Sequence, residues 1–138
     1  MAGRKKRWLY KPPPGKPKHD VPESIRVEVE RRCNELVEAV LKPEHIKPPP
    51  KDKRFNYLVD IYTKWYRNYF HFCAKYLCPA PNAISPSFED NFARLEYAGE
   101  DRFNLSYMRH TGQWYELFRE ITLDECLKEI REMPHFMP

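Results

Sequence analysis

Apolar residues recur at two different periods along the chain, and these periods predict helices at its ends and strands in its middle. Between Pro22 and Leu41 the apolar residues are three or four positions apart, which places them on one face of a helix. They are Ile25, Val29, Cys33, Leu36, Val37 and Val40. Pro22 suits the first turn of a helix, and Pro43 is expected to end it. The first predicted element is therefore a helix over residues 22–41.

From residue 55 onward the period changes to two, which is typical of half-buried strands. Alternate residues from Phe55 to Trp65 are mostly apolar, and the alternation resumes from Phe70 to Tyr76. The residues between these runs are predicted to form a hairpin turn. The same stretch also fits a helical stripe, so helix and strand both remain open for residues 56–77. Its enrichment in aromatic and β-branched residues favours strands.

Three further alternating runs extend the predicted sheet. They cover residues 93–97, 103–107 and 114–118, and turns near Gly99 and Gly112 separate them. After the last run, Thr122 and Glu125 have the spacing of a capping box, and an apolar helical face follows before Pro134. The predicted fold class is α+β, an antiparallel β-meander of about five strands with an N-terminal and a C-terminal helix packed on it.

Charge divides the chain into a cationic leader and a mildly acidic body. The 138 residues carry a net charge of +4, but residues 1–19 contain seven lysines and arginines and no acid, so acids outnumber bases in the remainder. Prolines in the leader favour an extended backbone. We therefore expect a basic, proline-rich arm over residues 1–20 and a single domain over residues 21–138. A basic, proline-rich connector over residues 42–54 lies inside that domain.

The strongest functional signal is a cluster of cations next to aromatic residues in the arm. Cations neutralise phosphates and flat rings stack on exposed bases, so the combination is typical of nucleic-acid binding. The leading hypothesis is a non-catalytic binding protein whose arm contacts nucleic acid or another polyanion. A solubilising tail, or rings that fold back onto the sheet, is the structural alternative. The predicted contact residues are Arg4, Lys5, Lys6, Arg7, Trp8, Tyr10, Lys11, Lys51, Lys53 and Arg54.

Two alternatives come from other classes of function. Arg109 and His110 precede a glycine turn, and with Tyr62 they are candidates for a small-ligand or catalytic site on the aromatic sheet. No catalytic signature is present in the sequence, so a binding protein is favoured over an enzyme. The remaining alternative is a protein–protein interaction module, including a homodimer.

The cysteines and the hydropathy of the chain indicate whether it binds a metal, whether its thiols are reduced and where in the cell it is located. His71, Cys73 and Cys78 lie close together, but their spacing lacks the two ligand pairs of a zinc site, so neither a metal nor a cofactor is expected. No apolar run is long enough to span a bilayer and no export signal is visible, so we expect no membrane partner. The four cysteines are expected to be reduced thiols of a cytoplasmic protein.

Several short sequence runs in the second half of the chain resemble those of a known protein family. They are Phe88-Glu89, Ala93 to Tyr97, Arg102 to Leu105, Arg109 to Trp114, Cys126-Leu127 and Pro134. With these runs, roughly the last two thirds of the chain resemble a family of small uncharacterised bacterial proteins. The resemblance implies a bacterial α+β domain and assigns no catalytic residue.

Overall fold

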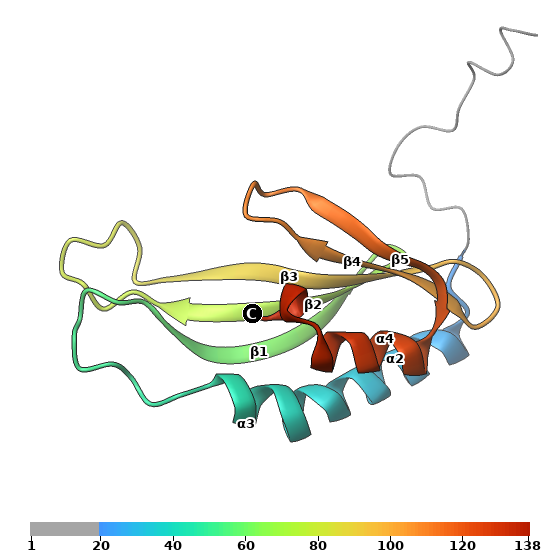
Figure 1. Ribbon diagram of the computed structural model, residues 1–138, viewed down its shortest axis with the longest axis horizontal. Coiled ribbons are helices and arrows are strands. Elements are labelled where there is room, and N and C mark those ends of the chain that lie inside the picture. Colours follow the sequence, from blue (N-terminus) through green and yellow to red (C-terminus); the bar gives the residue numbers. More distant parts are fainter. Residues whose placement is uncertain (1–19) are drawn as a thin grey trace, which may run out of the picture.

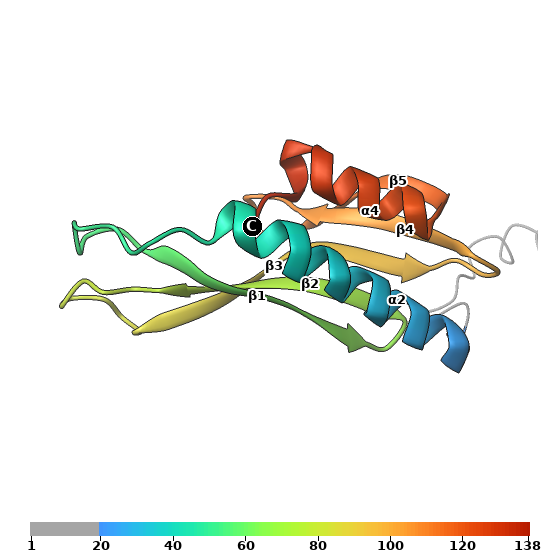
Figure 2. The ribbon, with the colours of Figure 1, turned by 90° about the horizontal axis from the view of Figure 1, so that it is seen from below.

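The computed structural model of the chain describes residues 20–138, and in it five antiparallel strands form one sheet. The strands follow the chain in the order β1-β2-β3-β4-β5, so each pairs with its sequence neighbour. The helices lie together on one face of the sheet (Figures 1 and 2). The α+β meander is confirmed, and the stretch over residues 56–77 forms two strands, not a helix. The elements are α2 (Glu23–Leu36), η1 (Val37–Leu41), α3 (Lys42–His45), β1 (Tyr57–Tyr66), β2 (Tyr69–Leu77), β3 (Ser87–Tyr97), β4 (Arg102–Met108), β5 (Trp114–Thr122), α4 (Leu123–Glu132) and η2 (Pro134–Phe136).

The hydrophobic core lies between the sheet and the helices. Alternate strand residues face the helices because successive side chains of a strand point to opposite sides. The strands contribute Ile61, Phe70, Phe72, Ala74, Ala93, Leu95, Phe103 and Leu105. The helices and the C-terminal turn contribute Val29, Cys33, Val37, Leu41, Cys126, Ile130 and Phe136. The apolar face predicted for each terminal helix is the face that packs on the sheet.

The prediction that Pro43 ends the first helix is wrong by about one turn. Helix α2 passes through the π-helical turn η1 into α3, and Pro43 is a helical residue of α3. Within this turn the Lys42 N–H donates to the carbonyl of Val37, five residues earlier. The π turn widens the helix at the point where a proline ring would otherwise crowd the preceding turn. The irregular connector therefore begins at Ile46.

β3 and β5 are longer than the alternation predicted, whereas the first hairpin turn and the capping box are confirmed. β3 begins at Ser87, six residues before the predicted run, and β5 continues to Thr122, where α4 follows directly. The β1–β2 hairpin turns through two residues, of which Arg67 has a φ of 58°. The capping box is present, since Thr122 Oγ1 accepts from the Glu125 N–H at 3.2 Å and Glu125 Oε1 accepts from the Thr122 N–H at 2.9 Å. This cap fixes the start of α4 at the end of the sheet.

Candidate functional site

The sheet face without helices carries polar and aromatic side chains in place of a second apolar core. In β2, Phe70 and Phe72 pack toward the helices, so Tyr69 and His71 point to the opposite face. The same alternation places Arg94 of β3 on this face, directly opposite His71. We call the group formed by Tyr66, Tyr69, His71, Arg94 and Trp114 the open-face cluster.

Arg94 is held between two aromatic rings. Its guanidinium carbon lies 4.3 Å from the centre of the Tyr69 ring and 4.6 Å from the centre of the Trp114 ring. Burial is the main cause that lowers the pKa of Arg94, and its Nε has no hydrogen-bond partner in residues 20–138. No carboxylate of that part of the chain forms an ion pair with it within 4.0 Å. The sandwich thus holds a half-buried cation that Glu96 and Glu116 influence without forming a close ion pair with it.

His71 closes the cluster beside this cation. Its side chain is only 7% exposed, and its ring lies 5.6 Å from that of Trp114. The contact is made although two strands separate β2 from β5, so Trp114 reaches over β3 and β4. Burial, reinforced by Arg94 and Lys64, lowers the pKa of His71 to about 4. His71 is therefore neutral at pH 7, and Arg94 supplies the charge of the pair.

The low pKa of His71 predicts a loss of stability in acid. A histidine with a folded pKa of about 4 takes up its proton more readily in the unfolded chain, whose pKa is 6.5. Its contribution is complete above pH 6.5 and falls by at most ~1.4 kcal/mol per pH unit between there and pH 4. In His71→Phe, which keeps a ring at this position, urea unfolding should depend less steeply on pH in that window. Identical pH profiles of variant and parent would contradict the assignment.

The charge on the helix-free face changes sign across the sheet. On the β1 and β2 side lie the exposed Lys64 and Arg67, whose guanidinium carbon is 5.2 Å from the centre of the Tyr66 ring. From the end of β3 to β5 a cavity of about 350 Å³ is bordered by several acids. Its charged lining residues are Glu96, Glu116, Arg119 and Glu120. An anionic ligand would therefore be favoured over β1, β2 and Arg94, and disfavoured from Glu96 to the far edge.

The connector cations predicted to bind nucleic acid lie at the far end of the first helical stretch. Lys51, Lys53 and Arg54 are exposed, and Arg54 pairs with Asp52 at 2.7 Å. The helical stretch from Glu23 to His45 is ~35 Å long, and it separates this segment from the base of the arm. The predicted arm contacts, from Arg4 to Lys11, lie outside the described residues. Their role stays a prediction.

The residues predicted for a small-ligand site do not meet in the contacts that the structure describes. Arg109 and His110 are exposed at the turn between β4 and β5. The Arg109 guanidinium lies over the ring of Tyr115 at 5.3 Å, whereas Tyr62 is half-buried in β1 on the helix-free face. The hypothesis of a ligand site at these three residues stays a prediction.

Three residues of the open-face cluster were given other roles, or none, by sequence reasoning. As the first apolar residue of the alternating run over residues 114–118, Trp114 would be expected to anchor the core, but the structure places it half-buried on the helix-free face. His71 was considered only as a zinc ligand, and Arg94 received no role. The alternation itself held the signal, because both residues stand between core residues of their strands and so must face the other way.

The cysteines are free thiols. Cys33, Cys73 and Cys126 are buried and Cys78 is half-buried, and burial raises the pKa of Cys126 to about 12. The thiol of Cys126 is therefore protonated at neutral pH. Within residues 20–138 no group of three or more histidine, cysteine or acidic side chains is placed to hold a metal ion. In that same part of the chain, no helix has the length and apolar character that crossing a membrane requires.

Comparisons with known proteins identify a family and no activity. A family model described as a domain of unknown function (DUF3024) matches residues 21–138. The match covers the whole domain that the structure describes apart from Asp20. Neither a curated protein nor a solved structure matches the chain.

Proposed function

We propose, for a chain that belongs to the DUF3024 family of domains of unknown function, that it binds single-stranded nucleic acid through the open-face cluster together with its basic arm. The observation that carries the proposal is the Arg94 cation held between Tyr69 and Trp114 on the face that the helices leave free. A bacterial cytoplasm, where thiols remain reduced, is the location we propose for this binding.

The chemistry of the cluster suits a strand with unpaired bases. Aromatic rings on a sheet surface stack on bases, and a nearby guanidinium attracts the phosphates between them. Bases inside a duplex are already stacked on one another, so rings on a sheet face could reach them only in single-stranded segments. Tyr66, 55% exposed, and the half-buried Tyr69 and Trp114 offer such rings. The acids from Glu96 of β3 to β5 would direct the strand across β1, β2 and Arg94.

The base of the arm lies next to this surface. Near the start of α2, Arg26 donates through Nη2 to the carbonyl of Arg67 at 3.1 Å, and its guanidinium lies over Trp65 at 4.7 Å. These contacts tie the beginning of the described chain to the β1–β2 turn, beside Tyr66. Residues 1–19 span up to ~65 Å when extended, so the arm is long enough to follow a strand bound on the sheet.

The proposal is tested by removing one ring of the sandwich. Trp114→Ala should weaken the binding of fluorescein-labelled oligouridine about 5- to 150-fold, because stacking on one base contributes roughly 1–3 kcal/mol. Fluorescence anisotropy measures the dissociation constant. Tyr115→Ala is the matched control, since Tyr115 is the next residue, is 45% exposed and packs against Tyr107 on the helix side. Equal affinities for the parent and both variants would reject the open-face cluster as the binding surface.

A further inference from the structure

A groove of about 280 Å³ lies between α2 and the start of α4, away from the open-face cluster. Its apolar lining comes from one side of α2, from the start of β4 and from the first residue of α4. These residues are Ile25, Val29, Phe103 and Leu123. The volume and apolar walls suit a single large side chain, and we call this feature the interhelix groove.

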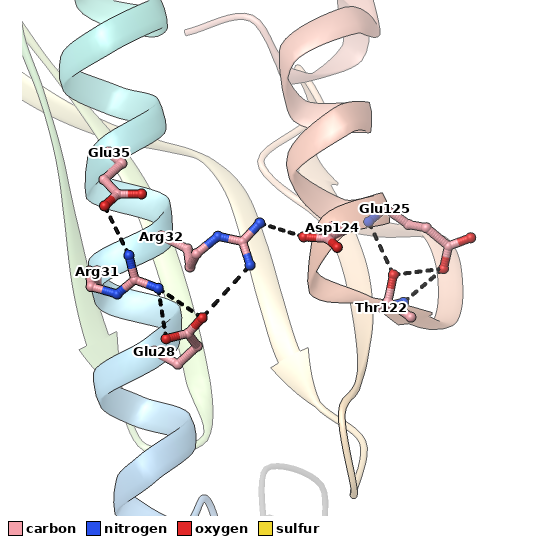
Figure 3. Close-up of polar contacts among 7 residues, drawn as sticks. All are labelled: Glu28, Arg31, Arg32, Glu35, Thr122, Asp124 and Glu125. Atoms are coloured by element: carbon pink, nitrogen blue, oxygen red, sulfur yellow. Dashed lines mark hydrogen bonds and ion pairs between the residues drawn. The ribbon is translucent and has the colours of Figure 1, made fainter.

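The rim of the interhelix groove carries charged side chains of both signs. Three carboxylates, those of Glu28, Asp101 and Asp124, border it together with the guanidinium of Arg32. Outside the lining, Arg31 pairs with Glu28 and Arg102 pairs with Asp101. Figure 3 shows Arg32 of α2 pointing across to Asp124 of α4, with which it forms an ion pair, while Glu28 lies 3.8 Å from Arg32 and 3.0 Å from Arg31. The Arg32–Asp124 pair holds the two helices at the spacing that leaves the groove between them. The three carboxylates are partly exposed and can accept further hydrogen bonds, so the groove accommodates an occupant that is apolar in its centre and cationic around it.

We propose that Trp8 of the chain's own N-terminal arm docks in the interhelix groove, with the neighbouring cations of the arm beside the carboxylates of its rim. The arm joins the domain at Val21, which is buried, only four residues before Ile25 of the groove wall. The twelve residues between Trp8 and Val21 can span up to ~40 Å, so the tether reaches the groove with slack. Docking through such a tether is intramolecular, and its effective concentration is of millimolar order.

The charges and the aromatic content of the arm match this groove. Trp8 stands between Arg7 and Leu9, with Lys6 and Lys11 close by, so an apolar anchor is surrounded by cations that can face the rim carboxylates. Burying an indole removes the largest apolar surface of the arm from water. The cations would remain at the rim, where salt screens them. Docking withdraws Trp8 from other partners, and the inference holds whether or not the chain binds nucleic acid.

Fluorine NMR of the full chain labelled with 5-fluorotryptophan tests the docking without any ligand. The chain has three tryptophans, and Trp8→Ala assigns the signal of Trp8 by removing it. We expect this signal in the parent to be displaced from its position in the urea-unfolded chain. In Ile25→Gln, which makes the groove wall polar, the Trp8 signal should move to the chemical shift that it has in the urea-unfolded chain. In Val27→Gln it should stay where it is in the parent. Val27 is on the same helix and 56% exposed, so it is the matched control. A Trp8 signal at the unfolded position in the parent would overturn the proposal, as would one unmoved by Ile25→Gln.

The fluorine signal of Trp65, which packs against the core, shows whether Ile25→Gln is folded. If that variant fails to fold, a second measurement still tests the proposal. Trp8→Ala alters only the arm, so the core of residues 20–138 keeps all its side chains. Docking predicts that this substitution shifts the backbone amide signals of Val29, Phe103 and Leu123, whereas Pro14→Ala leaves them in place. Amide signals unchanged by Trp8→Ala would overturn the proposal.

Discussion

Replacement of Ile61 by aspartate is expected to unfold the domain. Ile61 is 0% exposed and lies near the middle of β1, paired with Ala74 of β2 on the face that packs against the helices. A carboxylate there would be buried without a partner or would have to take up a proton, and an unpaired buried charge costs several kcal/mol. The loss of the apolar side chain adds about 2–5 kcal/mol. Since a domain is typically stable by only ~5–15 kcal/mol, the sum approaches or exceeds the whole stability.

Far-UV circular dichroism and urea titration measure this effect. The matched control is Tyr66→Asp, which places the same charge in the same strand but at a position that is 55% exposed on the helix-free face. That variant should stay folded and lose only contacts of the open-face cluster. A soluble Ile61→Asp protein with the spectrum and urea midpoint of the parent would show that the helix-facing side of β1 is not the core.

The fold could be predicted from the sequence because burial on one side of each element leaves a period in the chain. The helical period placed Val29 and Cys33 on one face, and the period of two placed Phe70 and Phe72 on another, as the structure confirms. The error at Pro43 has a local cause. A proline normally ends a helix, but here the π turn before Pro43 accommodates its ring. The spacing of apolar residues does not predict such a turn.

The open-face cluster could not be assembled from the sequence in the same way. Its contacts join residues from four strands, and the pair formed by His71 and Trp114 spans strands that are not neighbours. Periodicity gives the face on which a residue lies but not the residues it meets across the sheet. Trp114 shows the consequence, because a large aromatic residue at the start of a strand suggests a core anchor, whereas the structure places it on the helix-free face. A charge at Trp114 is therefore expected to leave the fold intact, whereas the same charge at Ile61 should destroy it.

The two faces of the sheet thus have different roles, one in stability and the other in the proposed binding. The helix side is closed by apolar packing and by the Thr122 cap, so it supplies stability. The other side keeps a cation, a neutral histidine and exposed rings, which contribute little to an apolar core and suit a ligand instead. This division is why variants on one face should change unfolding while variants on the other change binding.

Removing the positive charge of the arm is expected to cause the largest loss of nucleic-acid affinity. Each phosphate that a cation neutralises on a single strand releases counterions and contributes ~0.7 to the slope of log affinity against log salt. Replacing four cations with glutamine should therefore make the slope shallower by about 3. Between 50 and 200 mM salt, the parent would then lose roughly 50-fold more affinity than the variant. The four substitutions are Arg4→Gln, Lys5→Gln, Lys6→Gln and Arg7→Gln.

Anisotropy titrations of labelled oligouridine at several salt concentrations give both slopes, and the connector supplies the control. Replacing Lys51, Lys53 and Arg54 with glutamine removes three cations from a segment that lies at the other end of the helical stretch, where Asp52 already neutralises Arg54. These substitutions should change the slope much less than the four in the arm. If the connector variant lost the salt dependence and the arm variant kept it, the binding track would run over the far end of the molecule. The open-face cluster, which lies beside the base of the arm, would then be the wrong surface.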